Sequence, residues 1–362
     1  MLRLHAAEIA PLVWLHEFFA PAFTVEQGPP RAADIPLHFD VDAHEHARLE
    51  TALARATAAE IDGVSFDGRF SIHRSWTETS GHRWAHDAER DLYYGAAADH
   101  RSFRIVARTD DRRQRIGYMR VVREIATSAR LADGNLPIHA AAFARGDEVV
   151  LVCGQKRSGK TTLLTHALEC GASFVANDRV FVESHAPFVV HGMPTIVALR
   201  AGTLGMLPHF GERFDAARFE AARTMEECGP GVERPAPEVP PGKERAPVSP
   251  SQFCALAGAS MRASGRAGLC LFPRLDPSVS GIRLSPVKPA DAVALLMGSL
   301  LRPSRPLRGS DLFKLEPART LWSSEEEERR CREFLAAVPA WECRLGADAY
   351  QADLLATLER AS

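Results

Sequence analysis

"EVVLVCGQKRSGKTTLLTHALEC", residues 148–170, decides the fold that we expect for this chain. Residues 148–153 form a short β-branched run that is typical of a buried strand, and a glycine-rich turn follows it. From Lys160 onward, leucine and alanine recur at helical spacing until Gly171. The stretch therefore predicts a strand, a loop and a helix, in that order.

The predicted loop has the residue types of a phosphate-binding loop. Gly154, Gly159, Lys160 and Thr161 fit the pattern G-x-x-x-x-G-K-[ST], in which backbone N–H groups surround phosphate oxygens, the lysine reaches the outer phosphates and the hydroxyl binds Mg²⁺. Glycine permits positive φ and a close approach to the anion, and a helix N-terminus attracts negative charge. We expect ATP to bind through Gly154, Arg157, Ser158, Gly159, Lys160, Thr161 and Thr162.

A carboxylate follows this unit. "GASFVANDRVFVE", residues 171–183, places Asp178 at the end of a predicted strand, where its side chain could bind Mg²⁺ or accept a proton. Asn-Asp is also a common turn dipeptide, so spacing alone leaves a turn-capping role for Asp178 equally open. The expected Mg²⁺ ligands are Thr161 and Asp178.

Residues 136–183 resemble the catalytic core of the HPr kinase/phosphorylase family and of its relatives that phosphorylate serine in natural-product precursor peptides. The shared pattern is a histidine before a small residue, then the phosphate loop, and then an acidic pair followed by arginine. It is matched by His139 with Ala140, residues 154–162, and Asp178 with Arg179. The later segments 191–205, 249–259, 271–277 and 338–348 are more loosely similar to HPr-kinase-related proteins from biosynthetic settings.

The resemblance implies an α/β fold, namely a P-loop kinase core of the HPr kinase/PEP carboxykinase type with a mixed sheet. It implies Asp178, His139 and Lys160 as catalytic residues, with His139 beside the γ-phosphate or the acceptor. A buried structural histidine is the alternative for His139. Arg179 could pair with Asp178 or contact phosphate, and Arg200 and Arg274 are candidate outer anchors in otherwise apolar segments. For each arginine, a structural salt bridge is at least as good an interpretation.

One position departs from the family pattern. The family usually carries two aspartates where this chain has Asn177 and Asp178, and the first of them is assigned as the acid/base. Asparagine cannot take up a proton, so the role must move to Asp178, pass to another group or be dispensable. The substitution argues against reversible phosphorylase activity.

The chain divides by pattern into two parts. Residues 1–130 form an expected α+β N-terminal region of unknown role, which does not resemble the regulatory domain of true HPr kinases. Residues 131–362 form the expected HPr-kinase-like catalytic domain. Within it, residues 228–250 are dense in proline, glycine and charge, which predicts a flexible loop that closes over substrate as a lid.

Further elements follow from periodicity. We expect strands over 172–176, 179–184, 195–199 and 268–273, helices over 289–301 and 323–338, and in the N-terminal region strand-like pieces at 68–76, 91–97 and 102–109 before a helix at 117–132. Ser324 and Glu327 have the spacing of a capping box. His82 and His86 are spaced to share a helix face near His73, but no matching ligand pair accompanies them, so packed histidines are favoured over a metal site.

Composition limits the partners. The formal net charge of the 362 residues is −2, so we expect neither a nucleic-acid nor a membrane partner. The Cys residues are scattered, which suits a reducing cytoplasm, and Glu8, His16 and Glu17 interrupt the apolar start in a way that does not favour a signal peptide. A homo-oligomer is left open.

Together these features predict an ATP-dependent kinase of the phosphotransferase class that transfers the γ-phosphate to a hydroxyl group. The preferred acceptor is serine of a peptide or small protein, in a biosynthetic setting. The alternatives are a kinase for a small-molecule alcohol, a P-loop ATPase or assembly factor that transfers no phosphate, and a degenerate structural partner.

Overall fold

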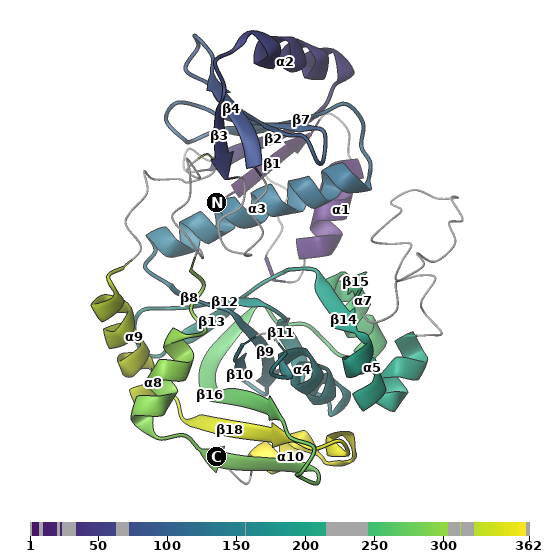
Figure 1. The fold of residues 1–362 in the computed structure, drawn as a ribbon, viewed down its shortest axis with the longest axis vertical. Coiled ribbons are helices and arrows are strands. Elements are labelled where there is room, and N and C mark those ends of the chain that lie inside the picture. Colours follow the sequence, from purple (N-terminus) through teal and green to yellow (C-terminus); the bar gives the residue numbers. More distant parts are fainter. Residues whose placement is uncertain are drawn as a thin grey trace. The chain divides into compact units, whose positions relative to one another are not determined.

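The computed structural model describes residues 2–6, 10–19, 22–23, 34–62, 72–155, 157–214, 245–302, 312 and 322–359. The chain is a mixed α/β protein with one seven-stranded and one nine-stranded mixed sheet (Figure 1). It divides into two compact units, the first chiefly Val25–Asp133 and the second chiefly Gly134–Leu301 with Trp322–Ser362. No described helix is both long and apolar enough to cross a bilayer.

Unit 1 is built on the seven-stranded sheet, whose order is β1-β2-β7-β6-β5-β4-β3. Neighbours β1, β2 and β7 run parallel, whereas the pairs from β7 to β3 are antiparallel. Its elements are β1 (Leu2–Ala6), β2 (Ile35–Val41), α2 (Ala43–Arg55), β3 (Ala59–Asp62), β4 (Ile72–Thr77), β5 (Arg83–Asp87), β6 (Leu92–Ala96), β7 (Phe103–Ala107) and α3 (Arg112–Ala132). The boundary between the units in the sequence falls within helix α1 (Ala10–Phe19), since Glu17 belongs to unit 1 and Phe18 to unit 2.

Helices α2 and α3 cover opposite faces of this sheet (Figure 1). On one face, Leu49 and Leu53 of α2 pack with Trp84 and other aromatic residues of the strands. On the other face, the ring of Tyr118 in α3 meets Phe39 edge to face, with 5.2 Å between ring centroids. Unit 1 therefore has apolar layers on both sides of its sheet.

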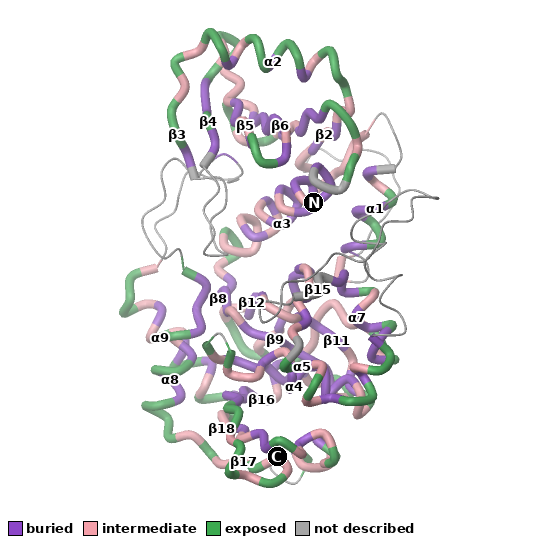
Figure 2. Tube along the Cα trace, turned by 45° about the vertical axis from the view of Figure 1, so that its right-hand side comes forward, coloured by how far each residue is buried: buried purple, intermediate pink, exposed green. Residues whose placement is uncertain are grey.

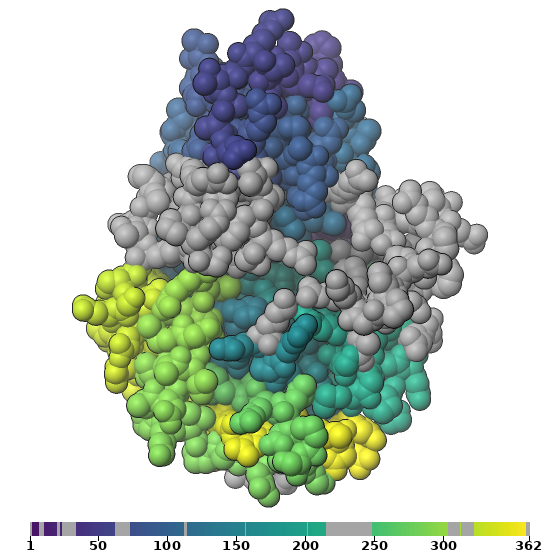
Figure 3. All heavy atoms as spheres, in the orientation of Figure 1, coloured from purple at the N-terminus to yellow at the C-terminus, as the bar shows by residue number. Residues whose placement is uncertain are grey.

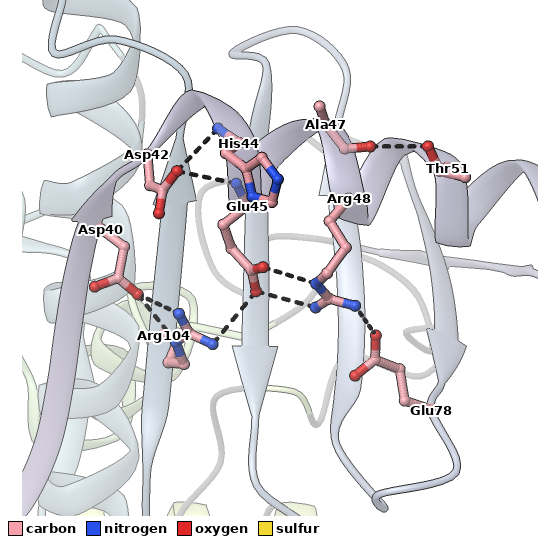
Figure 4. A network of polar contacts seen from close by, with 9 residues as sticks. All are labelled: Asp40, Asp42, His44, Glu45, Ala47, Arg48, Thr51, Glu78 and Arg104. Atoms are coloured by element: carbon pink, nitrogen blue, oxygen red, sulfur yellow. Dashed lines mark hydrogen bonds and ion pairs between the residues drawn. The ribbon is translucent and has the colours of Figure 1, made fainter.

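Charged side chains of α2 are tied to the neighbouring strands (Figure 4). Arg48 donates to Glu45 at 2.7 Å and to Glu78 at 2.9 Å. Arg104 of β7 donates to Asp40 of β2 at 2.7 Å and lies 3.5 Å from Glu45. These groups are partly exposed, so we assign the network to the surface and only a small share of the stability.

The expectation that His82 and His86 share a helix face is wrong. His86 lies in β5 and His82 directly precedes it, because this stretch pairs with β4 and β6 on either side. The ring of His86 stacks on Tyr93 with 4.6 Å between centroids. Within the described ranges, no cluster of three or more histidine, cysteine and carboxylate side chains is placed to hold a metal ion.

Unit 2 is built on the nine-stranded sheet. The order of its main path is β11-β9-β10-β16-β13-β12-β8, with β18 beside β16 and β17 beside β18. Its strands are β8 (Leu136–Ile138), β9 (Ala140–Arg145), β10 (Glu148–Cys153), β11 (Ser173–Ala176), β12 (Arg179–Val182), β13 (Val189–Met193), β16 (Ser264–Leu275), β17 (Ile282–Pro286) and β18 (Ala340–Leu345). A separate two-stranded sheet pairs β14 (Val197–Arg200) with β15 (Arg245–Val248).

The helices of unit 2 cover both faces of the nine-stranded sheet. Among them are α4 (Lys160–Glu169), α5 (Ala201–Met206), α7 (Pro250–Ala257), α8 (Pro289–Met297), α9 (Ser324–Ala337) and α10 (Leu354–Glu359), with the 3-10 helix η1 (Ala349–Gln351). Leu163 and Leu164 of α4 pack with Val150 and Val152 of β10, whereas Leu296 of α8 and Phe334 of α9 pack on the opposite face. Figure 2 shows β8, β9, β12 and β16 as largely buried between these layers.

Most predicted elements of this unit are present. The strand at 148–153 is confirmed as β10, and the helix that begins at Lys160 is α4. The helix predicted at 323–338 is α9, whereas the one predicted at 289–301 is α8, which ends earlier, at Met297 before Gly298. The capping residue of α9 was predicted one position too late, because Ser323 Oγ accepts from the N–H of Glu326 at 3.2 Å.

The prediction of a flexible loop over 228–250 is wrong for residues 245–250. Residues 228–244 lie outside the described residues, but Arg245–Val248 is strand β15, paired with β14. Ser249 then caps α7 in a capping box with Gln252. Strand pairing and the cap give residues 245–250 ordered hydrogen-bond partners, which the proline-rich composition did not indicate.

Candidate functional site

The strand register brings three segments of unit 2 together at the carboxyl-terminal end of β10. Cys153, the last residue of β10, pairs with Ala140 of β9, so His139 and Gly154 both lie just beyond this pair. On the other side of β9, Ala176 of β11 pairs with Ala142, and the chain continues into Asn177 and Asp178. In Figure 3, blue-to-teal atoms of this part of the chain reach the surface beside green atoms of later segments.

The loop between β10 and α4 requires its glycines. Gly159 has φ of 101°, in the left-handed region, and a Cβ there would lie 3.0 Å from Leu275 Cδ2. Gly154 has φ of 151°, and a Cβ there would lie 2.8 Å from Ser158 Oγ. The positive φ at both positions strains any residue that carries a Cβ, which is why the loop needs glycine there, as the sequence pattern predicted.

Lys160 begins α4 and reaches back across the loop. Its Nζ donates to the carbonyl oxygens of Gly154 at 2.6 Å and Gln155 at 3.2 Å. The residue is only 9% exposed, and burial lowers the pKa of Lys160 while the charge of Asp178 opposes that shift. The ammonium group is thus held within the loop and lies in the field of the candidate carboxylate.

The other predicted loop residues differ in accessibility. Arg157 is exposed with φ of 73°, a conformation that is uncommon outside glycine and often found at functional sites. Ser158 Oγ is buried without a hydrogen-bond partner among the described residues. Thr161 is partly buried, but Thr162 is buried and its hydroxyl lies 3.2 Å from that of Thr203 in α5. The side chain of Thr162 therefore anchors α5, which leaves only its backbone N–H for a phosphate.

His139 and Asp178 are in direct contact, although 39 residues separate them in the sequence. His139 Nδ1 lies 3.1 Å from the main-chain oxygen of Asp178 and 3.2 Å from its carboxylate Oδ1. Both side chains remain accessible, at 35% and 40% exposure. The backbone N–H of His139 donates to Ser299 at 2.7 Å, which fixes the residue between β8 and β9.

These contacts determine which nitrogen of His139 carries hydrogen. Both partners of Nδ1 are oxygen acceptors, so Nδ1 must be the donor, and in the neutral ring Nε2 keeps its lone pair. Burial lowers the pKa of His139, the Asp178 charge opposes this, and Lys160 lowers the pKa further. The neutral ring can therefore accept a hydrogen bond or a proton at Nε2.

Arg179 is a buried neighbour of Asp178. Its Nε is 3.8 Å from Asp178 Oδ2, and its side chain is 1% exposed. Because Arg179 is so deeply buried, its geometry fits the structural salt bridge better than a contact with phosphate.

Asn177 makes two side-chain hydrogen bonds to the connection between β13 and β14. Thr195 Oγ1 donates to Asn177 Oδ1 at 2.9 Å, and Asn177 Nδ2 donates to the carbonyl oxygen of Ile196 at 3.2 Å. The amide is therefore engaged through both its oxygen and its nitrogen.

Arg200 and Arg274 lie at strand ends. Arg200 ends β14 and precedes α5, where it is partly buried. Arg274 is exposed near the end of β16, next to Pro273, whose Cδ would lie 3.8 Å from a Cβ on Gly154. Pro273 and Leu275 face the phosphate loop, so the alternation of side chains along β16 turns Arg274 toward the opposite face.

The donor groups suit a magnesium ion. Mg²⁺ in nucleotide sites takes oxygen ligands, usually one or two from the protein and the rest from phosphate and water. Thr161 offers a hydroxyl in the first turn of α4, and Asp178 offers a carboxylate that is 40% exposed. Both side chains therefore have the chemistry and access that the ion needs.

Three neighbours of the site were missed by the sequence reasoning. Thr195 and Thr203 bond to Asn177 and Thr162, and Leu275 lies against Gly159. No pattern identifies them, because each comes from a segment far along the chain and has an unremarkable residue type. Only Gly159, because it is a glycine, indicated that another segment packs closely against the loop.

No protein-family model matches this chain, and a search of curated proteins gave no match either.

Proposed function

We propose that this protein is an ATP-dependent kinase that transfers the γ-phosphate to a hydroxyl group, with a core of the HPr kinase type. The observation that carries the proposal is the meeting of Lys160, His139 and Asp178 at the end of β10. Lys160 Nζ donates to the carbonyl oxygen of Gly154, just beyond the Cys153–Ala140 pair, and His139 Nδ1 lies 3.2 Å from the Asp178 carboxylate. Phosphoryl transfer depends chiefly on positioning and charge stabilisation, which such a set supplies.

Each residue has a role in the proposed reaction. The backbone of residues 154–162 and the Lys160 ammonium group bind the phosphates and offset their charge. Thr161 and Asp178 hold Mg²⁺, which neutralises charge on the phosphates when bound. His139, oriented by Asp178, presents Nε2 to the acceptor hydroxyl, so the role that Asn177 cannot fill passes to this pair.

The acceptor that we favour is serine of a peptide or small protein, with a small-molecule alcohol as the alternative. The preference rests on the resemblance of residues 136–183 to peptide serine kinases. We place the reaction in the cytoplasm, where the free thiols found among the described cysteines are stable.

A second candidate is an ATPase that transfers no phosphate to an acceptor. The hydrogen-bonded amide of Asn177 favours it, because the first carboxylate of the family pattern is replaced by a group that cannot serve as a base.

The two functions are separated by following the γ-phosphate. The protein is incubated with γ-labelled ATP, Mg²⁺ and a panel of serine peptides and small alcohols. For a kinase, label moves to an acceptor and depends on Lys160, so that Lys160→Ala abolishes the transfer. Label found solely as inorganic phosphate across the panel would instead establish the ATPase, and no release of label at all would exclude both.

A further inference from the structure

The bend between β11 and β12 is fixed by a side-chain amide. Asn177 accepts from Thr195 Oγ1 at 2.9 Å and donates to Ile196 O at 3.2 Å, so one planar group bridges two consecutive residues of the β13–β14 connection. Thr195 is only 5% exposed. Buried hydrogen bonds of this kind are costly to leave unmade.

An amide fits this position better than a carboxylate. A carboxylate could still accept from Thr195, but it has no hydrogen to donate to the carbonyl oxygen of Ile196. Aspartate at position 177 would then place two acceptor oxygens against each other in a partly buried place. The residue at this position is therefore matched to its hydrogen-bond partners.

Backbone packing brings the two segments within reach. A Cβ on Gly192 of β13 would lie 2.1 Å from the carbonyl oxygen of Val175 in β11, a contact that only glycine permits. Asn177 lies two residues beyond Val175, and Thr195 lies three beyond Gly192. The bridge of Asn177 thus continues a close approach that begins in the strands.

The position of Asp178 depends on this bend. His139 Nδ1 lies near both the main-chain oxygen and the carboxylate of Asp178, so a rotation of the backbone at the bend moves both acceptors at once. Asn177 is the adjacent residue, and its amide ties the bend to a part of the chain outside the loop.

We propose that Asn177 is a positioning residue, which holds Asp178 against His139 through its bonds to Thr195 and Ile196. It does not touch the nucleotide. This inference rests on the proposed function, since it concerns the turnover of that site. It also explains why this chain has Asn177 before Asp178 where the HPr kinase family has two aspartates. The residue at the first position holds the bend in place instead of exchanging a proton.

The test uses variants at both ends of the hydrogen bond. Thr195→Val removes the hydroxyl with little change of shape, whereas Thr195→Ser retains it. We expect turnover to fall roughly tenfold or more in Thr195→Val and in Asn177→Asp, since small misplacements of reacting groups are costly. Thr195→Ser should remain within about twofold of the wild type. The Kd for nucleotide measured without Mg²⁺ should stay unchanged in all three variants, because the loop at 154–162 is untouched and the Mg²⁺ ligand Asp178 does not contribute under that condition.

Two results would overturn the inference. One is wild-type turnover in Asn177→Asp, and the other is a parallel loss of turnover and nucleotide binding in Thr195→Val, which would indicate general unfolding. If the wild-type protein transfers and hydrolyses nothing, the proposed function has failed, and crystal structures of the variants then decide. The inference expects the His139–Asp178 contact to be broken in Thr195→Val but kept in Thr195→Ser; an intact contact in both contradicts it.

Discussion

At the residue scale, the contact between His139 and Asp178 distinguishes this site from an isolated phosphate loop. Asp178 faces His139 Nδ1 through its carboxylate and its backbone at the same time. With Nδ1 facing two oxygen atoms, Nε2 is the acceptor of the neutral ring. The base in the proposed reaction is thus a two-residue unit, not the single aspartate that the family pattern suggests.

Replacing Asp178 by asparagine should separate binding from turnover. The amide keeps the size of the side chain but loses the charge that orients His139 and binds Mg²⁺, so we expect turnover to fall by about 10²-fold to 10⁴-fold. Binding of nucleotide without Mg²⁺ should change little. Steady-state rates and equilibrium binding measure the two effects, with the exposed Asp133→Asn as the control. An Asp178→Asn protein with wild-type rate would remove Asp178 from the site.

At the element scale, the β10–loop–α4 unit was predictable because its signals are local. An apolar run, a glycine pattern and helical spacing lie next to one another in the sequence, and β10 and α4 begin where those signals place them. The prediction for His82 and His86 was wrong because strand pairing of β5 with β4 and β6 overrides a spacing of four residues. The contacts of Asn177 were not predictable, since they depend on a long-range approach of β13 to β11.

That approach can be tested at Gly192. Gly192→Ala places a methyl group 2.1 Å from a backbone oxygen that cannot rotate away. We expect a loss of about 1–3 kcal/mol in the free energy of unfolding of this unit. Gly202→Ala in α5 is the matched control, since a Cβ there meets no described atom within 4 Å and alanine favours helix. Chemical denaturation measures both; equal stability of the two variants would contradict the close packing.

At the scale of the whole molecule, each unit has its own apolar core, and unit 1 also holds a buried ionised carboxylate. In unit 1, Asp87 is 2% exposed and accepts from Arg90 at 2.9 Å and from the Tyr94 hydroxyl at 2.9 Å. Burial by itself raises the pKa of Asp87, but His73 and Arg90 outweigh it and hold the pKa below its ordinary value of 3.8. The ionised carboxylate therefore stabilises unit 1.

This carboxylate predicts an acid-sensitive unit 1. Because the folded pKa of Asp87 lies below the unfolded one, its contribution is complete above the ordinary value of 3.8 and is lost as the pH falls through the lower, folded value. Asp87→Asn should lower the free energy of unfolding near neutral pH by on the order of 3 kcal/mol. On acidification, the stability of the variant should then fall less than that of the wild type. Hydrogen-exchange protection of β5 and β6, measured near neutral pH and at about pH 3, gives both quantities. Equal acid sensitivity of the two proteins would refute the assignment to Asp87.

The account depends most on the claim that residues 154–162 bind the phosphates of a nucleotide. Calorimetric titration of the protein with ATP, ADP and AMP tests it directly, with Lys160→Ala in parallel. A loop that binds the β- and γ-phosphates should bind ATP and ADP at least about tenfold more tightly than AMP, a difference of roughly 1.4 kcal/mol, and Lys160→Ala should abolish that difference. Equal affinity for the three nucleotides, or full ATP binding by Lys160→Ala, would contradict the account.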